Sequence, residues 1–454
     1  MALDLSPCEW RGVDGRVECG TLDVPEDRAH PSARTLRIFF VVARATGEVG
    51  GDPIFFFVGG PGGAASAAAA AMSAELPELR ASRDFVFIDQ RGTGRSAPLP
   101  CAEAPGLSRR LKPMFDHAEV AACRDSLQKG ADLRFYTTSD AALDTDDVRR
   151  VLGYRRINLH GSSYGTRAAW AYAARFPSRA RAMLLHGPAG PGFLMPMPFA
   201  RGLDEALDGV IDGCLADDAC AKRFPALRAD VARAFDRVRQ SPVPVRAGEV
   251  GGPLVDATMT HGELAEAVRH QLYTAAGAAG VPSLLSRAAA GDYAPIANVA
   301  IANRARLDRQ VARGMYLSVS CAEDIPFMTE PAIRDASSGT RPGDYRVRQQ
   351  IAACLAWPRG GALPAGFAAP VQTPALVEVG QFDPATPIDW ARRAMTFLPN
   401  GTLVVVPHGA HAFTNLGIDG CLSRVATAFF TQGSAQRLDT SCVAAARRPP
   451  FTLR

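Results

Sequence analysis

A serine in this chain lies within a pattern that is typical of a nucleophile. Residues 161–165 read Gly-Ser-Ser-Tyr-Gly, and this G-x-S-x-G pattern, centred on Ser163, stands between an apolar run and a helical pattern. A strand-turn-helix bend of this kind is too tight for side chains at its flanks, so it requires Gly161 and Gly165. The bend would project the Ser163 hydroxyl above the edge of a sheet, with the backbone N–H of Tyr164 aimed at the developing oxyanion. The motif can arise by chance in a Gly-rich chain, and its context is what indicates nucleophilic chemistry.

A second oxyanion donor is expected from the loop after an early strand. Residues 59–63, Gly-Gly-Pro-Gly-Gly, directly follow the Phe-rich apolar run 53–58, and Gly60 is the preferred N–H donor. The alternatives are a plain Gly-rich turn or a phosphate-binding loop. No Lys-Ser or Lys-Thr pair follows these glycines, so a nucleotide-binding loop has little support.

A serine nucleophile also needs a base and a carboxylate that orients the base, here expected in the order Ser, acid, His. Asp383 follows the apolar run 375–379 and is the predicted acid, with an Asp-Pro turn as the alternative. His408 and His411 both follow the last apolar run. His411 is the predicted base because the Gly-Ala pair before it supplies a flexible loop over the sheet, and His408 is the alternative.

The elements that must position these residues alternate between strand and helix. Short apolar runs predict buried strands, and apolar residues at helical spacing predict helices. The expected strands are 36–42, 53–58, 84–89, 156–160, 182–186, 375–379 and 402–406, and helices are expected at 140–152, with Ser139 or Asp140 as N-cap, and at 166–176. Such alternation predicts an α/β fold with a mostly parallel central sheet covered on both faces.

The alternation is interrupted from about residue 199 to residue 359, where the pattern is almost wholly helical. The simplest architecture is one sheet with an inserted helical cap. The predicted parts are a core segment 1–191, a cap 192–365 and a second core segment 366–454.

Composition excludes several classes of protein. The formal charge is +4 and 21% of residues are charged, which gives no reason to expect nucleic acid or an anionic membrane surface as partner. No run of eighteen apolar residues is present, so no membrane-spanning helix is expected. No metal site is expected either, because the chain has no Cys-x-x-Cys pair or His-rich helix.

Ten cysteines fall into neighbouring couples, which favours a disulfide-stapled exported protein. The couples are Cys8/Cys19, Cys101/Cys123, Cys214/Cys220, Cys321/Cys354 and Cys421/Cys442. The alternative is ten reduced thiols buried as small apolar groups. The first residues show no signal peptide, so a secreted or periplasmic protein would have lost one.

Several motifs in one order resemble the proline iminopeptidase and tripeptidyl aminopeptidase group of α/β-hydrolases. They are Gly-Gly-Pro-Gly at 59–62, Asp-Gln-Arg-Gly-Thr-Gly-Arg-Ser at 89–96, Gly-Ser-Ser-Tyr-Gly-Thr at 161–166, Cys-Ala-Glu-Asp at 321–324, Asp-Pro-Ala-Thr-Pro at 383–387 and the Cys-bounded segment 421–442. The resemblance covers nearly the whole chain. It implies an α/β-hydrolase fold with a helical cap, export, and hydrolysis of peptides from a free N-terminus or of carboxylic esters, without a cofactor.

The resemblance also implies roles for single residues. Ser163 would be the nucleophile, Asp383 the orienting acid and His411 the base, while Thr386 would brace the Asp383 loop by hydrogen bonding. Gly60 and Tyr164 would again supply the oxyanion N–H groups.

Three positions depart from the usual pattern of this group. Val58 stands where many prolyl aminopeptidases have His, His186 where Asp is usual, and Ala410 where Gly commonly precedes the catalytic His. No member of the triad is lost, but the departures weaken any close equivalence of substrate.

The sequence alone does not decide whether a peptide bond or an ester bond is cleaved. An aminopeptidase must bind a substrate ammonium, for which Glu323 and Asp324 are the candidates; alternatively, they cap a helix or pair with a nearby Arg. A carboxylesterase or lactonase with a hydrophobic substrate is the second hypothesis, and a catalytically inactive binding protein on the same fold is the third. The expected partner is a small peptide or ester substrate.

Overall fold

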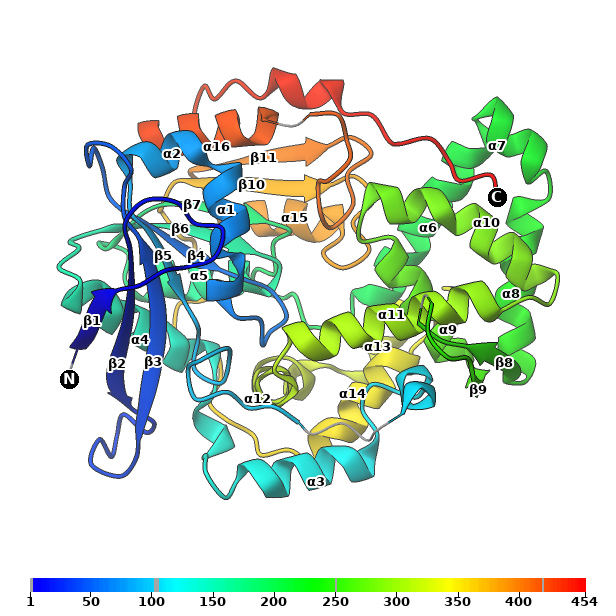
Figure 1. Ribbon diagram of the computed structural model, residues 1–454, viewed down its shortest axis with the longest axis horizontal. Coiled ribbons are helices and arrows are strands. Elements are labelled where there is room, and N and C mark those ends of the chain that lie inside the picture. Colours follow the sequence, from blue (N-terminus) through cyan, green and yellow to red (C-terminus); the bar gives the residue numbers. More distant parts are fainter. Residues whose placement is uncertain (1–2, 102–105, 250, 419) are drawn as a thin grey trace.

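The computed structural model describes residues 3–101, 106–249, 251–418 and 420–454. It confirms an α/β fold built on one large sheet of nine strands, in the order β1-β2-β3-β5-β4-β6-β7-β10-β11 (Figure 1). The strands are β1 Leu3–Pro7, β2 Val17–Pro25, β3 Thr35–Ala43, β4 Ile54–Phe57, β5 Phe85–Ile88, β6 Ile157–Ser162, β7 Ala180–His186, β10 Ala375–Gly380 and β11 Gly401–Val406.

Seven of these strands are the expected ones, with bounds that differ by a few residues. The strands from β5 through β11 are parallel, whereas β1, β2 and β3 run antiparallel and form one edge. The parallel strands are almost continuously buried, as a sheet covered on both faces requires. Their carboxyl ends meet along one edge, where the loops that follow them can converge.

Helices cover both faces of the sheet. One face packs against α4 Thr138–Val151, α5 Tyr164–Arg175 and α15 Ile388–Met395. The other face packs against α1 Ala69–Glu75, α2 Pro77–Ser82 and α16 Cys421–Gln432. The N-cap of α4 differs from the expected one, because the Thr137 side chain accepts the hydrogen bond of the Asp140 N–H.

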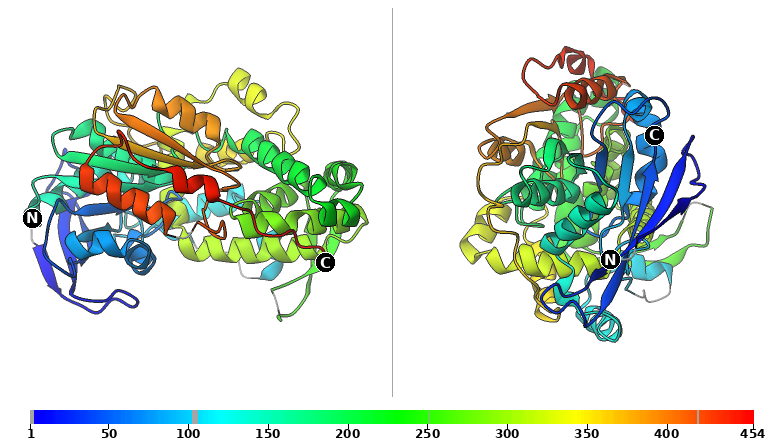
Figure 2. Two further views of the ribbon diagram at one scale, coloured as in Figure 1. Left: turned by 90° about the horizontal axis from the view of Figure 1, so that it is seen from above. Right: turned by 90° about the vertical axis from the view of Figure 1, so that its left-hand side faces the viewer.

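A second hydrophobic cluster lies beyond the carboxyl edge of the sheet and is built by helices α6 to α11, called the cap below. They are α6 Phe199–Leu215, α7 Asp218–Arg223, α8 Leu227–Gln240, α9 His261–Gln271, α10 Ala275–Ala289 and α11 Ala294–Gln310. The arrowheads of β10 and β11 point toward these helices, and the cap lies beside the sheet in Figure 1 and in the left-hand view of Figure 2. The cap is not wholly helical, since β8 Val243–Ala247 and β9 Val255–Met259 form an antiparallel hairpin within the segment that was expected to be almost wholly helical.

The chain returns to the sheet side before residue 365. The helices α12 Arg313–Glu323 and α14 Tyr345–Leu355 contribute Met315, Val319 and Ala353 to the same apolar cluster as the sheet. The short helix α13 Glu330–Ser337 separates them, and α3 His117–Leu127 packs beside α12. The last part of the expected cap segment, from α12 onward, therefore packs on the sheet cluster through α12 and α14.

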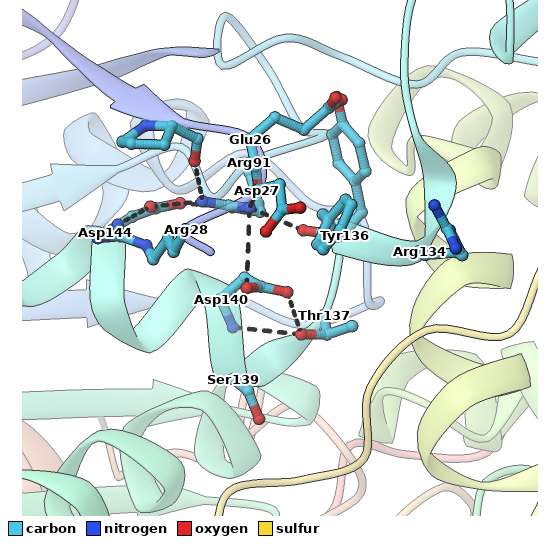
Figure 3. Close-up of polar contacts among 12 residues, drawn as sticks. Glu26, Asp27, Arg28, Arg91, Arg134, Tyr136, Thr137, Ser139, Asp140 and Asp144 are labelled. Carbon is cyan, nitrogen blue, oxygen red and sulfur yellow. Dashed lines mark hydrogen bonds and ion pairs between the residues drawn. The ribbon is translucent and has the colours of Figure 1, made fainter. Parts of the chain in front are cut away.

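The Asp-Gln-Arg-Gly-Thr-Gly-Arg-Ser motif at residues 89–96 stabilises the fold. Arg91, fully buried, donates two hydrogen bonds of 2.7 Å to the Asp144 carboxylate and further ones to the carbonyls of Glu26 and Phe135 (Figure 3). A paired guanidinium at this point ties β5 to α4 and to the end of β2. Asp89 in turn accepts hydrogen bonds from Ser66 and from the N–H of Arg95, which fixes the loop after β4.

The five cysteine couples are joined as disulfides, as expected. Helices long and apolar enough to cross a bilayer do not occur in the described part of the chain.

Candidate active site

Ser163 lies at the sharp bend between β6 and α5. Its backbone has φ 57° and ψ −126°, a conformation that non-glycine residues rarely adopt and that costs free energy. A Cβ on Gly161 would lie 2.7 Å from the Gly165 carbonyl oxygen, and one on Gly165 would lie 2.1 Å from that of Phe57. The bend is therefore open only to glycine at both flanks. The Ser163 N–H donates a hydrogen bond to the His186 carbonyl at 2.8 Å, and this bond helps to stabilise the strained backbone conformation.

A histidine and a carboxylate are paired beside this bend. The Nδ1 of His411 lies 2.8 Å from Oδ2 and 3.0 Å from Oδ1 of Asp383. Thr386 donates from its hydroxyl to Asp383 Oδ2 at 2.7 Å and from its N–H to Oδ1 at 2.8 Å. Although burial alone would raise the pKa of Asp383, the adjacent His411 and the Thr386 donors lower it. Asp383 is thus an ionised acceptor that holds one ring nitrogen of His411.

The two candidate histidines have different surroundings. His411 and Ser163 line the same cavity, whereas His408 lines another one near Phe382 and Phe451. His408 also has a positive φ of 56°, and its N–H binds the Gln381 side chain. The geometry therefore favours His411 as the base.

The glycine loop after β4 lies directly against Ser163. A Cβ on Gly59 would stand 2.9 Å from the Ser163 Cβ and 3.2 Å from its Oγ. The Gly63 N–H binds the Gly59 carbonyl at 3.2 Å, so the loop turns back over the serine. Gly60 lines the same cavity as Ser163, a position from which its N–H can face a bound carbonyl.

The cavity above Ser163 has a volume of about 500 Å³. Its apolar wall includes Phe115, Met195 and Phe199, the last two from the expected entry to the cap. A site of this size is typical of pockets for small molecules or short peptides.

Glu323 and Asp324 do not line the cavity above Ser163. Both side chains are fully buried, and Asp324 Oδ1 accepts a hydrogen bond of 2.8 Å from Arg167. Glu323 accepts two hydrogen bonds of 2.7 Å from the N–H and hydroxyl of Thr138. Burial raises the pKa of Glu323 to about 7 and also raises that of Asp324.

The small pocket between this cluster and Ser163 is lined by Arg167 and, among the described residues, by neither carboxylate. This arrangement argues against the predicted ammonium anchor, because a guanidinium stands where the ammonium would have to approach. The alternative reading, in which Glu323 and Asp324 pair with a nearby Arg, is the one found.

The chain is matched over residues 52–414 by the family model of the alpha/beta hydrolase fold. It belongs to that family. Three relatives link this α/β-hydrolase to the group that its motifs resemble. The serine protease Hip1 of Mycobacterium tuberculosis H37Rv is 25% identical, covering 97% of this chain and 91% of its own. The tripeptidyl aminopeptidase of Streptomyces coelicolor is 25% identical, covering 97% and 86%. The proline iminopeptidase of Neisseria meningitidis MC58 is 31% identical over 31% of this chain and 34% of its own.

The family and these relatives make the protein a serine hydrolase. Groups of three or more side chains that could hold a metal ion do not occur in the part of the hydrolase that the structure describes.

Two residues at the site of this α/β-hydrolase were not predicted. The Tyr273 ring packs edge-on against His411, with centroids 4.8 Å apart, and its carbonyl accepts a 2.8 Å hydrogen bond from the Ala412 N–H. The ring nitrogen Nε2 of His186 lies 2.8 Å from the His411 carbonyl oxygen. Tyr273 lies in the cap and carries no local motif, so only the three-dimensional contact reveals it. His186 was noted as a departure from the usual Asp, and that exchange was the available signal.

Proposed function

We propose that Ser163, His411 and Asp383 form a catalytic triad that cleaves an acyl bond through an acyl-enzyme. The observation that carries the proposal is the cavity shared by Ser163 and His411, with Asp383 bonded to the far ring nitrogen of the histidine. Because Asp383 is an ionised acceptor, Nδ1 bears the proton and Nε2 is free to accept another.

The reaction proceeds in two balanced halves. The His411 Nε2 takes the Ser163 proton as Oγ bonds to the substrate carbonyl carbon, and the resulting oxyanion accepts hydrogen bonds from the N–H groups of Gly60 and Tyr164. The carbon–leaving group bond then breaks, and the leaving amine or alcohol takes the proton from His411. A water molecule repeats these steps on the ester and restores the Ser163 hydroxyl.

For the substrate, we propose a short peptide from which an N-terminal segment is released. The relatives named serine protease and tripeptidyl aminopeptidase, each aligned over nearly the whole chain, support a peptidase. A carboxylic ester is the second candidate, since the same groups cleave activated esters readily. Five disulfides support export to an oxidising compartment as the setting.

The triad is tested by labelling with a fluorophosphonate probe. We expect the wild-type protein to be labelled and Ser163→Ala to be silent, while Ser162→Ala, a matched change one residue away, retains labelling. Equal labelling of wild type and Ser163→Ala would refute the nucleophile.

The bond type is tested with tripeptide p-nitroanilides that have a free or an acetylated N-terminus. An aminopeptidase should cleave the free form at least about tenfold faster in kcat/KM, a difference of about 1.4 kcal/mol. Equal rates would remove the aminopeptidase assignment, and turnover of p-nitrophenyl esters with no anilide cleavage would favour the esterase.

A further inference from the structure

The cavity above Ser163 is strongly basic. The described side chains that line it include five arginines and a single carboxylate, which are Arg269, Arg306, Arg309, Arg313, Arg346 and Asp308. This is a local excess, because the formal charge of the whole chain is only +4. A cleft lined by one sign of charge focuses the field and attracts a substrate of the opposite sign.

The acidic side chains of the neighbourhood do not cancel this excess. Asp308 is shared between Arg304, at 3.0 Å, and Arg313, at 2.9 Å. Glu266 stands behind the wall, 2.7 Å from Arg269 and 3.6 Å from Arg346. Within the described part of the chain, no ion pair joins Arg306 or Arg309 to an acidic side chain.

The other buried acids and the histidine of the cavity do not change the balance. Glu323 and Asp324 lie behind Arg167, which is the side chain that faces the small pocket next to Ser163. His270 also lines the cavity, and burial with the nearby Arg269 lowers its pKa to about 3, so it is neutral.

The five arginines stand on four helices, α9, α11, α12 and α14, and two of these helices lie next to the loops of the triad. Arg306 and Arg309 lie in the last turns of α11, and the linker that follows binds the glycine loop through the Ala312 N–H and the Gly62 carbonyl at 2.9 Å. Arg269 stacks on Tyr273 at 5.3 Å, and the Tyr273 ring packs on His411. Arginines that line the cavity therefore lie next to both the glycine loop and the histidine loop.

We propose that the acyl part of the substrate carries a carboxylate, and that the exposed Arg306 and Arg309 guanidinium groups bind it. The proposal rests on the proposed function, because it specifies what Ser163 acylates. A guanidinium matches a carboxylate with two parallel hydrogen bonds, while the apolar wall at Phe115, Met195 and Phe199 accommodates the carbon chain. An acidic residue in a peptide and a dicarboxylic half-ester present the same chemistry.

Paired substrates that differ only in this charge test the proposal. The peptide pair is Ala-Asp-Ala p-nitroanilide against Ala-Asn-Ala p-nitroanilide, and the ester pair is p-nitrophenyl monosuberate against its methyl ester. We expect kcat/KM to be about tenfold higher for the charged member, which corresponds to about 1.4 kcal/mol. The charged member with the larger kcat/KM shows whether the carboxylate belongs to a peptide or to an ester substrate.

In the double variant Arg306→Gln/Arg309→Gln, kcat/KM for the charged substrates should fall toward that for the neutral ones, so that most of this preference is lost. Arg392→Gln is the matched control, because Arg392 is an exposed helical arginine of α15 paired with Asp389. The preference should also shrink as salt rises from 50 mM to 500 mM, since screening weakens attraction between exposed charges.

Equal rates within both pairs, or a preference unchanged in the double variant, would overturn the proposal. In that case fluorophosphonate labelling of Ser163 and turnover of the neutral substrates would persist, so the triad would stand. If the wild-type protein showed neither turnover of any of these substrates nor labelling, the proposed function itself would be refuted.

Discussion

Thr386 illustrates how one hydroxyl can set the position of a catalytic pair. It donates to Asp383 at 2.7 Å and lies 3.3 Å from the His411 Nδ1. Thr386→Val keeps the shape and the main-chain donors but removes the hydroxyl donor. We expect kcat/KM to fall about ten- to a hundredfold, because one hydrogen bond to a charged group contributes roughly 1.5–3 kcal/mol. Thr386→Ser should retain activity within a few-fold, and an unchanged rate for the valine variant would contradict this role.

His186 contacts the backbone of both Ser163 and His411. Its carbonyl accepts the Ser163 N–H at 2.8 Å, and its Nε2 lies 2.8 Å from the His411 carbonyl. Despite burial, the nearby Glu378 raises the pKa of His186. His186→Phe would keep the ring contact with Phe413 and lose the N–H donor.

The expected result for His186→Phe is a several-fold lower kcat with KM nearly unchanged, because the loop that carries His411 loses a tether. His186→Gln, which can still donate an N–H, should recover most of the rate. A higher KM with an unchanged kcat would show that His186 does not help to position the base.

At the scale of elements, the junction of α5 and α12 depends on a buried charge cluster. Arg167 on α5 binds Asp324 at 2.8 Å and lies 3.5 Å from Glu323. Arg167→Met leaves two carboxylates buried without their cation, and such losses destabilise folding by about 3–5 kcal/mol. Urea denaturation should report this, and adding Glu323→Gln and Asp324→Asn should restore most of the stability. A triple variant no more stable than Arg167→Met would contradict the charge explanation.

Glu323 should also shape how the stability of the protein depends on pH. Burial raises its pKa to about 7 from an ordinary value of 4.5, so the folded state retains a proton that the unfolded chain releases. The stability from this proton is fully present below pH 4.5 and is lost as pH rises to about 7. Glu323→Gln, which does not titrate, should flatten this part of the profile in urea denaturation at pH 5 and pH 7.5. An identical slope for both proteins would contradict the raised pKa.

Elements of the sheet were predictable from sequence where burial left a continuous apolar run, as at β4 and β5. The strands β1 and β2 were not predicted, because polar residues such as Asp4, Glu18 and Asp23 interrupt their apolar pattern. The β8–β9 hairpin was not predicted either, because the turn residues between its strands do not by themselves show whether strands flank them.

The residues of the site were predictable to a similar degree. Ser163, Asp383 and His411 follow strand ends and carry local motifs, so their convergence at one edge could be anticipated. The ring contact of Tyr273 and the burial of Glu323 behind Arg167 depend on packing between distant segments, for which no local pattern exists.

At the scale of the molecule, disulfides close loops of very different length. Cys321–Cys354 spans 33 residues and Cys214–Cys220 spans 6. In the chain-entropy model, their removal should cost roughly 3–4 and about 2 kcal/mol. Pairwise Cys→Ala variants measured by urea denaturation should show this order, and the wild-type protein should yield no titratable thiol when unfolded without reductant. The reverse order would show that the loop-entropy account fails here.

The cap is bonded by main chain to both loops that carry the proposed catalytic groups, through Ala312 to Gly62 and through Ala412 to the Tyr273 carbonyl. Exchanging it for the cap of another hydrolase would therefore do more than alter the lining of the cleft. The graft would leave the glycine loop and the histidine loop each short of a hydrogen-bond partner. Chimeras that retain residues 273 and 311–312 from this chain should keep turnover, whereas complete exchanges should impair chemistry even for substrates that the new cap accepts.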